Sequence, residues 1–174
     1  MADFLEETAD ILKDIDRLQV HAVIEELRAL RDRHGRLFVI GNGGGAGHAS
    51  HASADFRKIG RIESYAWGEN ISDVTAYIND VSWEACIARW LEDSKFTTND
   101  AVLVFSVGGA SDTVSANLKW AMSYAMGATI LGIVGADGGE TARYGDAVIR
   151  IPTTSTPQVE GIQAVLWHMV VSAL

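Results

Sequence analysis

The chain has 174 residues, a length that suits one domain with a buried core and is short for two ordinary domains. Hydrophobic residues make up 48% of it and charged residues 21%, which is a globular composition and excludes the collagen-like and disordered classes. The formal net charge of −9 disfavours nucleic acid and anionic membrane surfaces as partners.

Cysteine usage and the absence of long apolar runs bear on location. Cys86 is the single cysteine, so an internal disulfide is impossible, and the acidic start of the chain is unlike a secretory signal. No apolar stretch approaches the ~20 residues of a membrane-spanning helix. We therefore expect a soluble, cytoplasmic protein with no membrane partner.

Apolar residues recur at helical spacing over 4–30, with charged residues between them, which predicts one long amphipathic helix or two in tandem. His34 and Gly35 end this helical segment. Residues 37–40 are wholly apolar, as in a strand buried on both faces of a parallel sheet. Further strands are expected over 64–67, 101–106, 129–134 and 147–151, and helices over 46–59, 71–77, 83–95, 113–126 and 159–173.

The alternation of strands and helices predicts an α/β sandwich with a mainly parallel sheet. No linker, low-complexity tract or internal repeat divides the chain, so one domain over residues 1–174 is expected. In an open α/β sheet, ligands bind outside the carboxyl ends of the strands. Function is therefore expected just after Ile40, Ser106 and Val134.

The first of these positions is a glycine-rich loop, residues 41–47, between a predicted strand and a predicted helix. Glycine lets the chain turn with positive φ and expose its N–H groups, and a helix N-terminus adds partial positive charge. An anion such as phosphate could be held there without lysine. The alternative is a tight turn that needs glycine only for packing.

A second glycine-rich loop, residues 106–111, follows the third predicted strand. Ser106 and Ser111 could donate hydroxyl groups to a phosphate, or Ser111 and Asp112 could cap the next helix, and spacing alone leaves both alternatives open.

The first loop also contains Gly41-x-Gly43-x-x-Ala46, which satisfies the dinucleotide fingerprint, with Glu63 or Glu69 about where a ribose-binding carboxylate would lie. A small NAD-dependent oxidoreductase is one hypothesis on this match alone. One domain of this size leaves little room for a substrate region, and no Gly-Lys-Ser or Gly-Lys-Thr is present. We therefore expect no nucleotide cofactor.

Two pairs of side chains are spaced to share a helix face. His51 and Asp55 are four residues apart, and Glu160 and His168 are eight apart. Together they suit Zn²⁺ or another divalent transition metal, and equally suit an acid–base pair. The alternative for His168, which lies among apolar residues, is a hydrogen-bonded core histidine.

Three further features are expected to have structural roles and no part in a functional site. His48 is expected on the surface. The dipeptide Asn79-Asp80 is read as a helix N-cap in preference to a substrate contact. The five tryptophans are read as core or subunit-contact residues.

The segments 41–56, 106–111 and 137–139, together with Asn79-Asp80 and Ser155-Thr156-Pro157, occur in an order that resembles the sugar isomerase (SIS) domain, in its phosphoheptose isomerase branch. The likeness covers nearly the whole chain. It implies a flavodoxin-like three-layer sandwich with a five-stranded, mainly parallel sheet over 35–174, preceded by a helical segment over 1–34. It also implies a homotetramer with active sites between subunits.

The resemblance further implies that a ketose phosphate and an aldose phosphate, sedoheptulose 7-phosphate and a heptose 7-phosphate, interconvert through an enediol. Aligned by motif, the acid–base histidine falls on His168 and its partner carboxylate on Asp55 or Glu160. With His51, these residues would hold Zn²⁺ where a metal is present. The sugar-phosphate ligand would contact Asn42, Gly43, Gly44, Gly45, Asp80, Ser106, Gly108, Ser111 and Thr156.

The chain departs from the family pattern at four places, and the shorter Asp55 and the lost hydroxyl groups motivate an alternative. Asp55 replaces glutamate and Glu160 replaces glutamine, while Gly45 stands in place of serine and Val107-Gly108 in place of Thr-Ser. The shorter Asp55 would reach less far, and a misplacement of ~1 Å can cost on the order of a hundredfold in rate. The alternative is a non-catalytic SIS module that binds a sugar phosphate as a sensor or partner subunit.

Overall fold

A computed structural model describes residues 2–111, 113 and 115–174. Its five strands form one sheet in the order β2-β1-β3-β4-β5, and every pairing between neighbours is parallel. This confirms the predicted five-stranded parallel sheet, whose strand order is flavodoxin-like. The strands are β1 (Leu37–Gly41), β2 (Ser64–Ala66), β3 (Ala101–Ser106), β4 (Thr129–Val134) and β5 (Ala147–Arg150).

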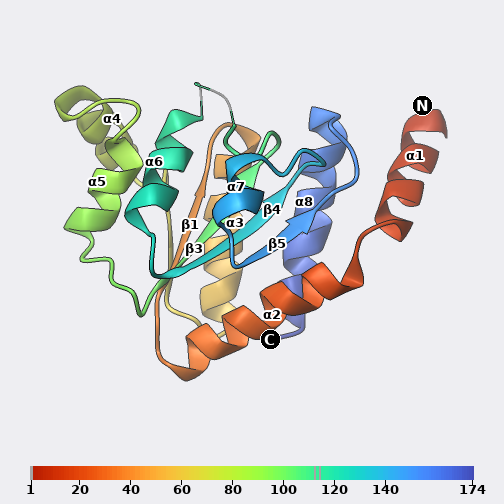
Figure 1. The fold of residues 1–174 in the computed structure, drawn as a ribbon, viewed down its shortest axis with the longest axis horizontal. Helices are drawn as coiled ribbons and strands as arrows, with labels where there is room; N and C mark the ends of the chain where they lie inside the picture. The colour runs from red at the N-terminus through yellow and green to blue at the C-terminus, as the bar shows by residue number, and fades with distance from the viewer. Residues whose placement is uncertain (1, 112, 114) are drawn as a thin grey trace.

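Helices cover both faces of the sheet, which confirms the three layers (Figure 1). Within β1, Leu37 and Val39 face one apolar cluster while Phe38 and Ile40 face the other, so the strand is buried on both sides as predicted. The first cluster is covered by α2 (Arg17–Asp32), α3 (Gly44–Lys58) and α8 (Thr156–Ser172), and the second by α4 (Ile71–Asp80), α5 (Cys86–Asp93), α6 (Ala116–Tyr124) and α7 (Gly139–Tyr144).

The N-terminal segment forms two helices, α1 (Ala2–Lys13) and α2, because Asp16 caps the second one. The Asp16 carboxylate accepts a hydrogen bond of 2.8 Å from the Leu18 N–H, which satisfies one of the free donors of a helix start. The apolar face of α2 is buried in the core, so this helix belongs to a layer of the sandwich. In contrast, α1 lies at the outer edge beside α8 (Figure 1).

Some element boundaries differ from the predicted ones. Helix α3 begins at Gly44, and α5 begins only at Cys86. The short helix α7 was not predicted, because six residues opened by glycine carry no readable periodicity. Reading Asn79-Asp80 as an N-cap is wrong, because the two residues end α4 and Ala85 precedes α5. Asp112, the other expected cap, lies outside the described residues.

Among the residues described, no helix combines the length and apolar character needed to cross a membrane.

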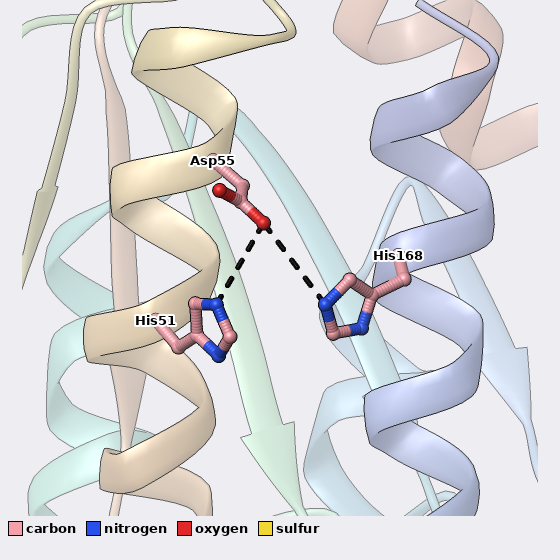
Figure 2. A group of neighbouring side chains, drawn as sticks. All are labelled: His51, Asp55 and His168. Carbon is pink, nitrogen blue, oxygen red and sulfur yellow. Dashed lines mark ion pairs between the residues drawn. The ribbon is translucent and has the colours of Figure 1, made fainter.

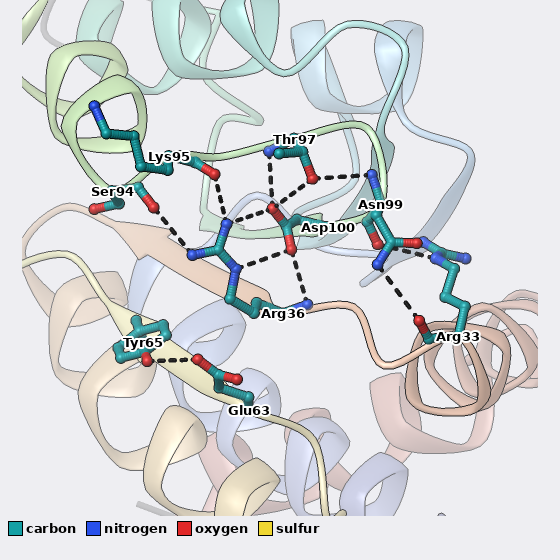
Figure 3. Close-up of polar contacts among 9 residues, drawn as sticks. All are labelled: Arg33, Arg36, Glu63, Tyr65, Ser94, Lys95, Thr97, Asn99 and Asp100. Atoms are coloured by element: carbon teal, nitrogen blue, oxygen red, sulfur yellow. Dashed lines mark hydrogen bonds and ion pairs between the residues drawn. The ribbon is translucent and has the colours of Figure 1, made fainter.

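A buried ion pair fixes the amino-terminal edge of the sheet (Figure 3). The Asp100 side chain is only 3% exposed, and its carboxylate accepts hydrogen bonds from Arg36 and from the backbone N–H and hydroxyl of Thr97. The guanidinium of Arg36 also donates to the carbonyl oxygens of Ser94 and Lys95. Burial opposes ionisation of Asp100, but the hydrogen bonds from Arg36 and Thr97 outweigh it and hold the pKa of Asp100 below its ordinary value.

We predict that Asp100→Asn lowers the free energy of unfolding by roughly 3 kcal/mol at pH 7, because the Arg36 guanidinium loses its buried partner. The stabilisation requires ionised Asp100, whose pKa is lowered in the folded state. It is therefore complete above the unfolded pKa of 3.8 and is lost as the pH falls through the folded pKa.

Urea unfolding of wild type and variant across pH 3–8 measures this difference. Asp93→Asn, which removes an exposed partner of Arg89 on α5, is the matched control and should leave stability almost unchanged. Equal stability of Asp100→Asn and wild type at pH 7 would contradict the assignment.

Candidate active site

Three side chains from opposite ends of the chain meet between α3 and α8 (Figure 2). Asp55 Oδ2 lies 3.8 Å from His51 Nε2 on the same helix and 4.0 Å from His168 Nε2 on α8. One ligand atom from each residue lies within 4.8 Å of the other two. The pairing of His51 with Asp55 follows from their four-residue spacing, while His168 arrives through the packing of α8 against α3.

The orientation of His168 is set by its own helix. Its Nδ1 lies 2.7 Å from the carbonyl oxygen of Ala164, an acceptor, so Nδ1 carries the proton and donates it. In the neutral ring, Nε2 then has a free lone pair that faces Asp55. The His168 side chain is 50% exposed, so the alternative of a core histidine is wrong.

The Asp55 carboxylate is surrounded by groups that can carry positive charge. Its side chain is 11% exposed, and Lys58 Nζ lies 3.6 Å from Oδ1 while the two imidazoles face Oδ2. Asp55 is therefore placed to accept a proton or to share a cation with the two imidazoles.

The three side chains fit a Zn²⁺ ion. Two imidazole nitrogens and a carboxylate oxygen are a common donor set for catalytic zinc, which leaves the fourth position to water or substrate. Bonds of about 2.0–2.1 Å in a tetrahedral arrangement separate the ligand atoms by roughly 3.4 Å. The observed separations of 3.8 and 4.0 Å need only small side-chain movements to reach that value.

Glu160, the fourth predicted ligand, lies outside this group. It sits on α8 two turns before His168, over the first residue of α3. A Cβ added to Gly44 would lie 2.5 Å from the Glu160 carboxyl group, so a side chain at this position would displace that carboxylate. His48 also reaches Glu160 and lies against the Phe105 ring, so its predicted surface position is wrong and it is half-buried. Burial lowers the pKa of His48, although Glu160 works in the opposite direction.

A cavity of about 170 Å³ lies at the carboxyl ends of β1 and β3, between the two glycine-rich loops. This is the point where the strand order reverses, and such points bind ligands in open α/β sheets. Four predicted ligand residues line the cavity, namely Asn42, Gly45, Ser106 and Gly108, and Glu160 lines it as well.

Two cavity residues, Ser115 and Gln163, were not predicted. Ser115 immediately precedes α6, and the expected helix start at residue 113 placed it inside the helix. Gln163 follows Glu160 by three residues, so it shares the face of α8 that Glu160 presents. This three-residue spacing was the sequence signal that could have identified Gln163 as a neighbour of Glu160.

The first loop is held in place by an amide pair. Asn42 Nδ2 donates to Asn117 Oδ1 at 2.8 Å, and Asn117 Nδ2 donates back to Asn42 Oδ1 at 3.0 Å. Asn117 is fully buried on α6, so the pair ties the first loop to the start of that helix. Gly43, which precedes α3, has φ of +54°, a conformation that few residues other than glycine adopt.

Five other predicted ligand residues do not line this cavity, namely Gly43 and Gly44 beside it at the start of α3, and Asp80, Ser111 and Thr156. Ser111 is exposed, with its hydroxyl beside Gly139. Thr156 is the exposed first residue of α8. Asp80 lines a separate cavity with Tyr77 and Arg89, between α4 and α5.

Comparisons with known proteins show which proteins the chain is similar to. No model of a known protein family matches the chain. The phosphoheptose isomerase of Helicobacter pylori (strain Shi470) is 26% identical over 170 residues, which cover 95% of this chain and 85% of the relative. The phosphoheptose isomerase of Clostridium acetobutylicum is 27% identical over 172 residues, which cover 95% of this chain and 86% of the relative.

A solved structure of a phosphoheptose isomerase from Neisseria gonorrhoeae superposes with a TM-score of 0.87 at 21% identity, over 98% of this chain and 94% of that one. This likeness shows that the two chains share a fold. Considered with the order of motifs along the sequence, the curated relatives support an assignment to the sugar isomerase (SIS) family, in its phosphoheptose isomerase branch.

Proposed function

We propose that this chain is an aldose–ketose isomerase that converts sedoheptulose 7-phosphate to a heptose 7-phosphate through an enediol. The curated relatives named phosphoheptose isomerase support this reaction. The observation that carries it within the chain is the 4.0 Å approach of His168 Nε2 to Asp55 Oδ2, which brings two groups able to exchange protons together at an accessible position.

In this mechanism Asp55 and His168 are the acid–base pair. The Asp55 carboxylate removes the proton from the carbon next to the sugar carbonyl, and His168 moves a proton between the two oxygens of the enediol. Asp55 then returns a proton to the former carbonyl carbon, which completes the isomerisation. We assign the carboxylate role to Asp55 in preference to Glu160, because Glu160 lies outside the group that contains His168.

The cavity between the loops is the proposed phosphate site. It lies at the N-termini of α3 and α6, where free N–H groups and the helix dipoles favour an anion. The Ser106 hydroxyl accepts a hydrogen bond from the Ala110 N–H at 3.0 Å, which leaves its own proton available to donate.

The separation between the two parts of the site supports a long sugar. Glu160 lines the cavity and His168 lies eight residues further along α8, about 12 Å at the helical rise per residue. An extended sugar phosphate of six or seven carbons can bridge this distance, with its phosphate in the cavity and its carbonyl end beside His168.

The proposal includes Zn²⁺ held by His51, Asp55 and His168, the three side chains whose ligand atoms lie within 4.8 Å of one another. When bound, the ion would polarise the sugar carbonyl as a Lewis acid.

A homotetramer with active sites between subunits is also part of the proposal. An apolar groove of about 470 Å³ runs between α2 and α8, lined by Ile15, Val20, Ile24, Val165 and Met169 among others. Val165 and Met169 flank His168 and are 50% and 44% exposed. A second copy covering this face would bury apolar surface next to His168, which supports sites at an interface. The cytoplasmic location stays a prediction.

We predict that the purified protein isomerises sedoheptulose 7-phosphate and that His168→Asn lowers kcat by at least ~100-fold, the usual contribution of a positioned acid–base group. Product formation is followed by NMR or by a coupled assay. His34→Asn is the matched control with full activity, because His34 lies outside the site at φ of +57°, a conformation that asparagine tolerates.

Thermal stabilisation by the sugar phosphate without any turnover would contradict the isomerase and would favour the sensor alternative, since a ligand of the native state raises stability by mass action.

We predict that each chain binds one Zn²⁺ ion and that His51→Gln abolishes this binding, because it removes one of three ligands. Affinity should fall as the pH is lowered, since an imidazole nitrogen must be unprotonated to bind metal. Equilibrium dialysis with metal analysis measures the stoichiometry, again with His34→Asn as the control. Unchanged stoichiometry in His51→Gln would place the metal elsewhere.

A further inference from the structure

An indole ring contacts both imidazoles of the site. Trp167 precedes His168 on α8, and its ring stacks on the His168 ring with a centroid separation of 3.5 Å and an angle of 25° between the planes. The His51 ring meets the same indole at a centroid distance of 4.8 Å and an angle of 67°. One aromatic side chain therefore contacts both histidines of the group that also contains Asp55.

The indole is fixed in the protein core, whereas the two imidazoles are accessible to solvent. Trp167 is 1% exposed and belongs to the first apolar cluster, which α2, α3 and α8 cover. The side chains of His51 and His168 are 62% and 50% exposed. Exposed side chains change rotamer within picoseconds to nanoseconds, so rings at this degree of exposure need a contact to hold one orientation. The buried indole supplies a fixed surface for both rings.

Trp167 contributes its ring and not a hydrogen bond. Its Nε1 is buried and has no acceptor among the residues that the structure describes. Contact with the indole sets the plane of the His168 ring, and the hydrogen bond from Nδ1 to the Ala164 carbonyl oxygen selects one of the two ring orientations in that plane. Together, these two contacts direct Nε2 of His168 toward Asp55, as Figure 2 shows.

Side chains that are already oriented bind a metal more tightly, because less rotamer freedom is lost on binding. We propose that Trp167 is a positioning residue whose indole holds His51 and His168 in the orientation at which they share a metal ion with Asp55. This inference rests on the proposed function in taking Zn²⁺ as the ion. It adds a residue that lies outside the ligand set and acts through the two imidazoles.

Two substitutions separate the aromatic contact from the volume of the side chain. Trp167→Phe keeps a ring and loses no hydrogen bond, whereas Trp167→Leu keeps an apolar side chain without a ring. Trp67→Leu is the matched control, because Trp67 is 4% exposed in the apolar cluster on the other face of the sheet, where it contacts Tyr77 and Trp90. Titration calorimetry with Zn²⁺ gives the affinity of each protein, and thermal unfolding gives its stability.

We predict that Trp167→Leu weakens Zn²⁺ binding about 10- to 100-fold, the usual effect of removing a group that orients metal ligands. Trp167→Phe should bind Zn²⁺ more tightly than Trp167→Leu, and Trp67→Leu should bind it like wild type although its stability is lowered. Equal affinity of Trp167→Leu and wild type would overturn the inference. An equal loss in Trp167→Phe and Trp167→Leu would overturn it too, because the ring would then be irrelevant, as would an equal loss in Trp67→Leu.

A measurement on the metal-free wild-type protein covers the case in which the Trp167 variants do not fold. The ring current of the stacked indole should move the ring-proton resonances of His168 to higher field in NMR spectra. At a pH where the ring is neutral, its nitrogen resonances should show the Nδ1–H tautomer alone. Proton resonances at the positions of a free histidine, or a mixture of tautomers, would overturn the inference.

The outcomes for the inference and for the proposed function can be told apart. Weaker Zn²⁺ binding by Trp167→Leu, in a protein whose wild type does not isomerise the sugar, would end the proposed function and leave this inference standing. A wild type that isomerises the sugar but binds no Zn²⁺ would overturn the inference and leave the isomerase standing.

Discussion

The packing of α3 against α8 on one face of the sheet is the constraint on which the site depends. Small residues of α3, Ala49 and Ala52, and large apolar residues of α8, Leu166 and Val170, are buried in the same core cluster. Since each helix has one face fixed in this cluster, the neighbouring faces that carry Asp55 and His168 must lie opposite each other. A parallel sheet makes this possible, because the helix after the first strand and the helix after the last strand can lie side by side although they are distant in sequence.

The same α3–α8 contact organises two chemically distinct places along its length. At its start, Glu160 covers Gly44 and lines a cavity at helix N-termini, a position suited to an anion and to hydroxyl groups. Two turns further along α8, two imidazoles and a carboxylate form a group suited to proton transfer or to metal. In the proposed function, this pair of helices positions both the substrate and the reacting groups, and the distance between the two places matches a long sugar phosphate.

The sequence predicted most of the fold because its signals are local. The apolar run of β1 and the glycines of the first loop each identify their own structure, whatever lies elsewhere in the chain. The pairing of His51 with Asp55 was also readable, because four residues make one helical turn. The sequence did not reveal that Glu160 lies apart from the group around His168. Two side chains on one helix face can contact different neighbours, and their spacing does not say which. Gln163 was missed although it follows Glu160 by three residues, because spacing alone does not show that this face of α8 lines a cavity.

In the proposed reaction, Asp55 moves a proton between two neighbouring carbons of the sugar, and His168 moves a proton between the two oxygens that they carry. The most direct test is to run the reaction in D₂O and to analyse the recovered sugars by NMR. Proton transfer through an enediol predicts that solvent deuterium enters the carbon next to the carbonyl, and that Asp55→Asn abolishes this exchange. Product that forms without any deuterium at that carbon would contradict the account, because hydrogen would then pass directly between the carbons without a base.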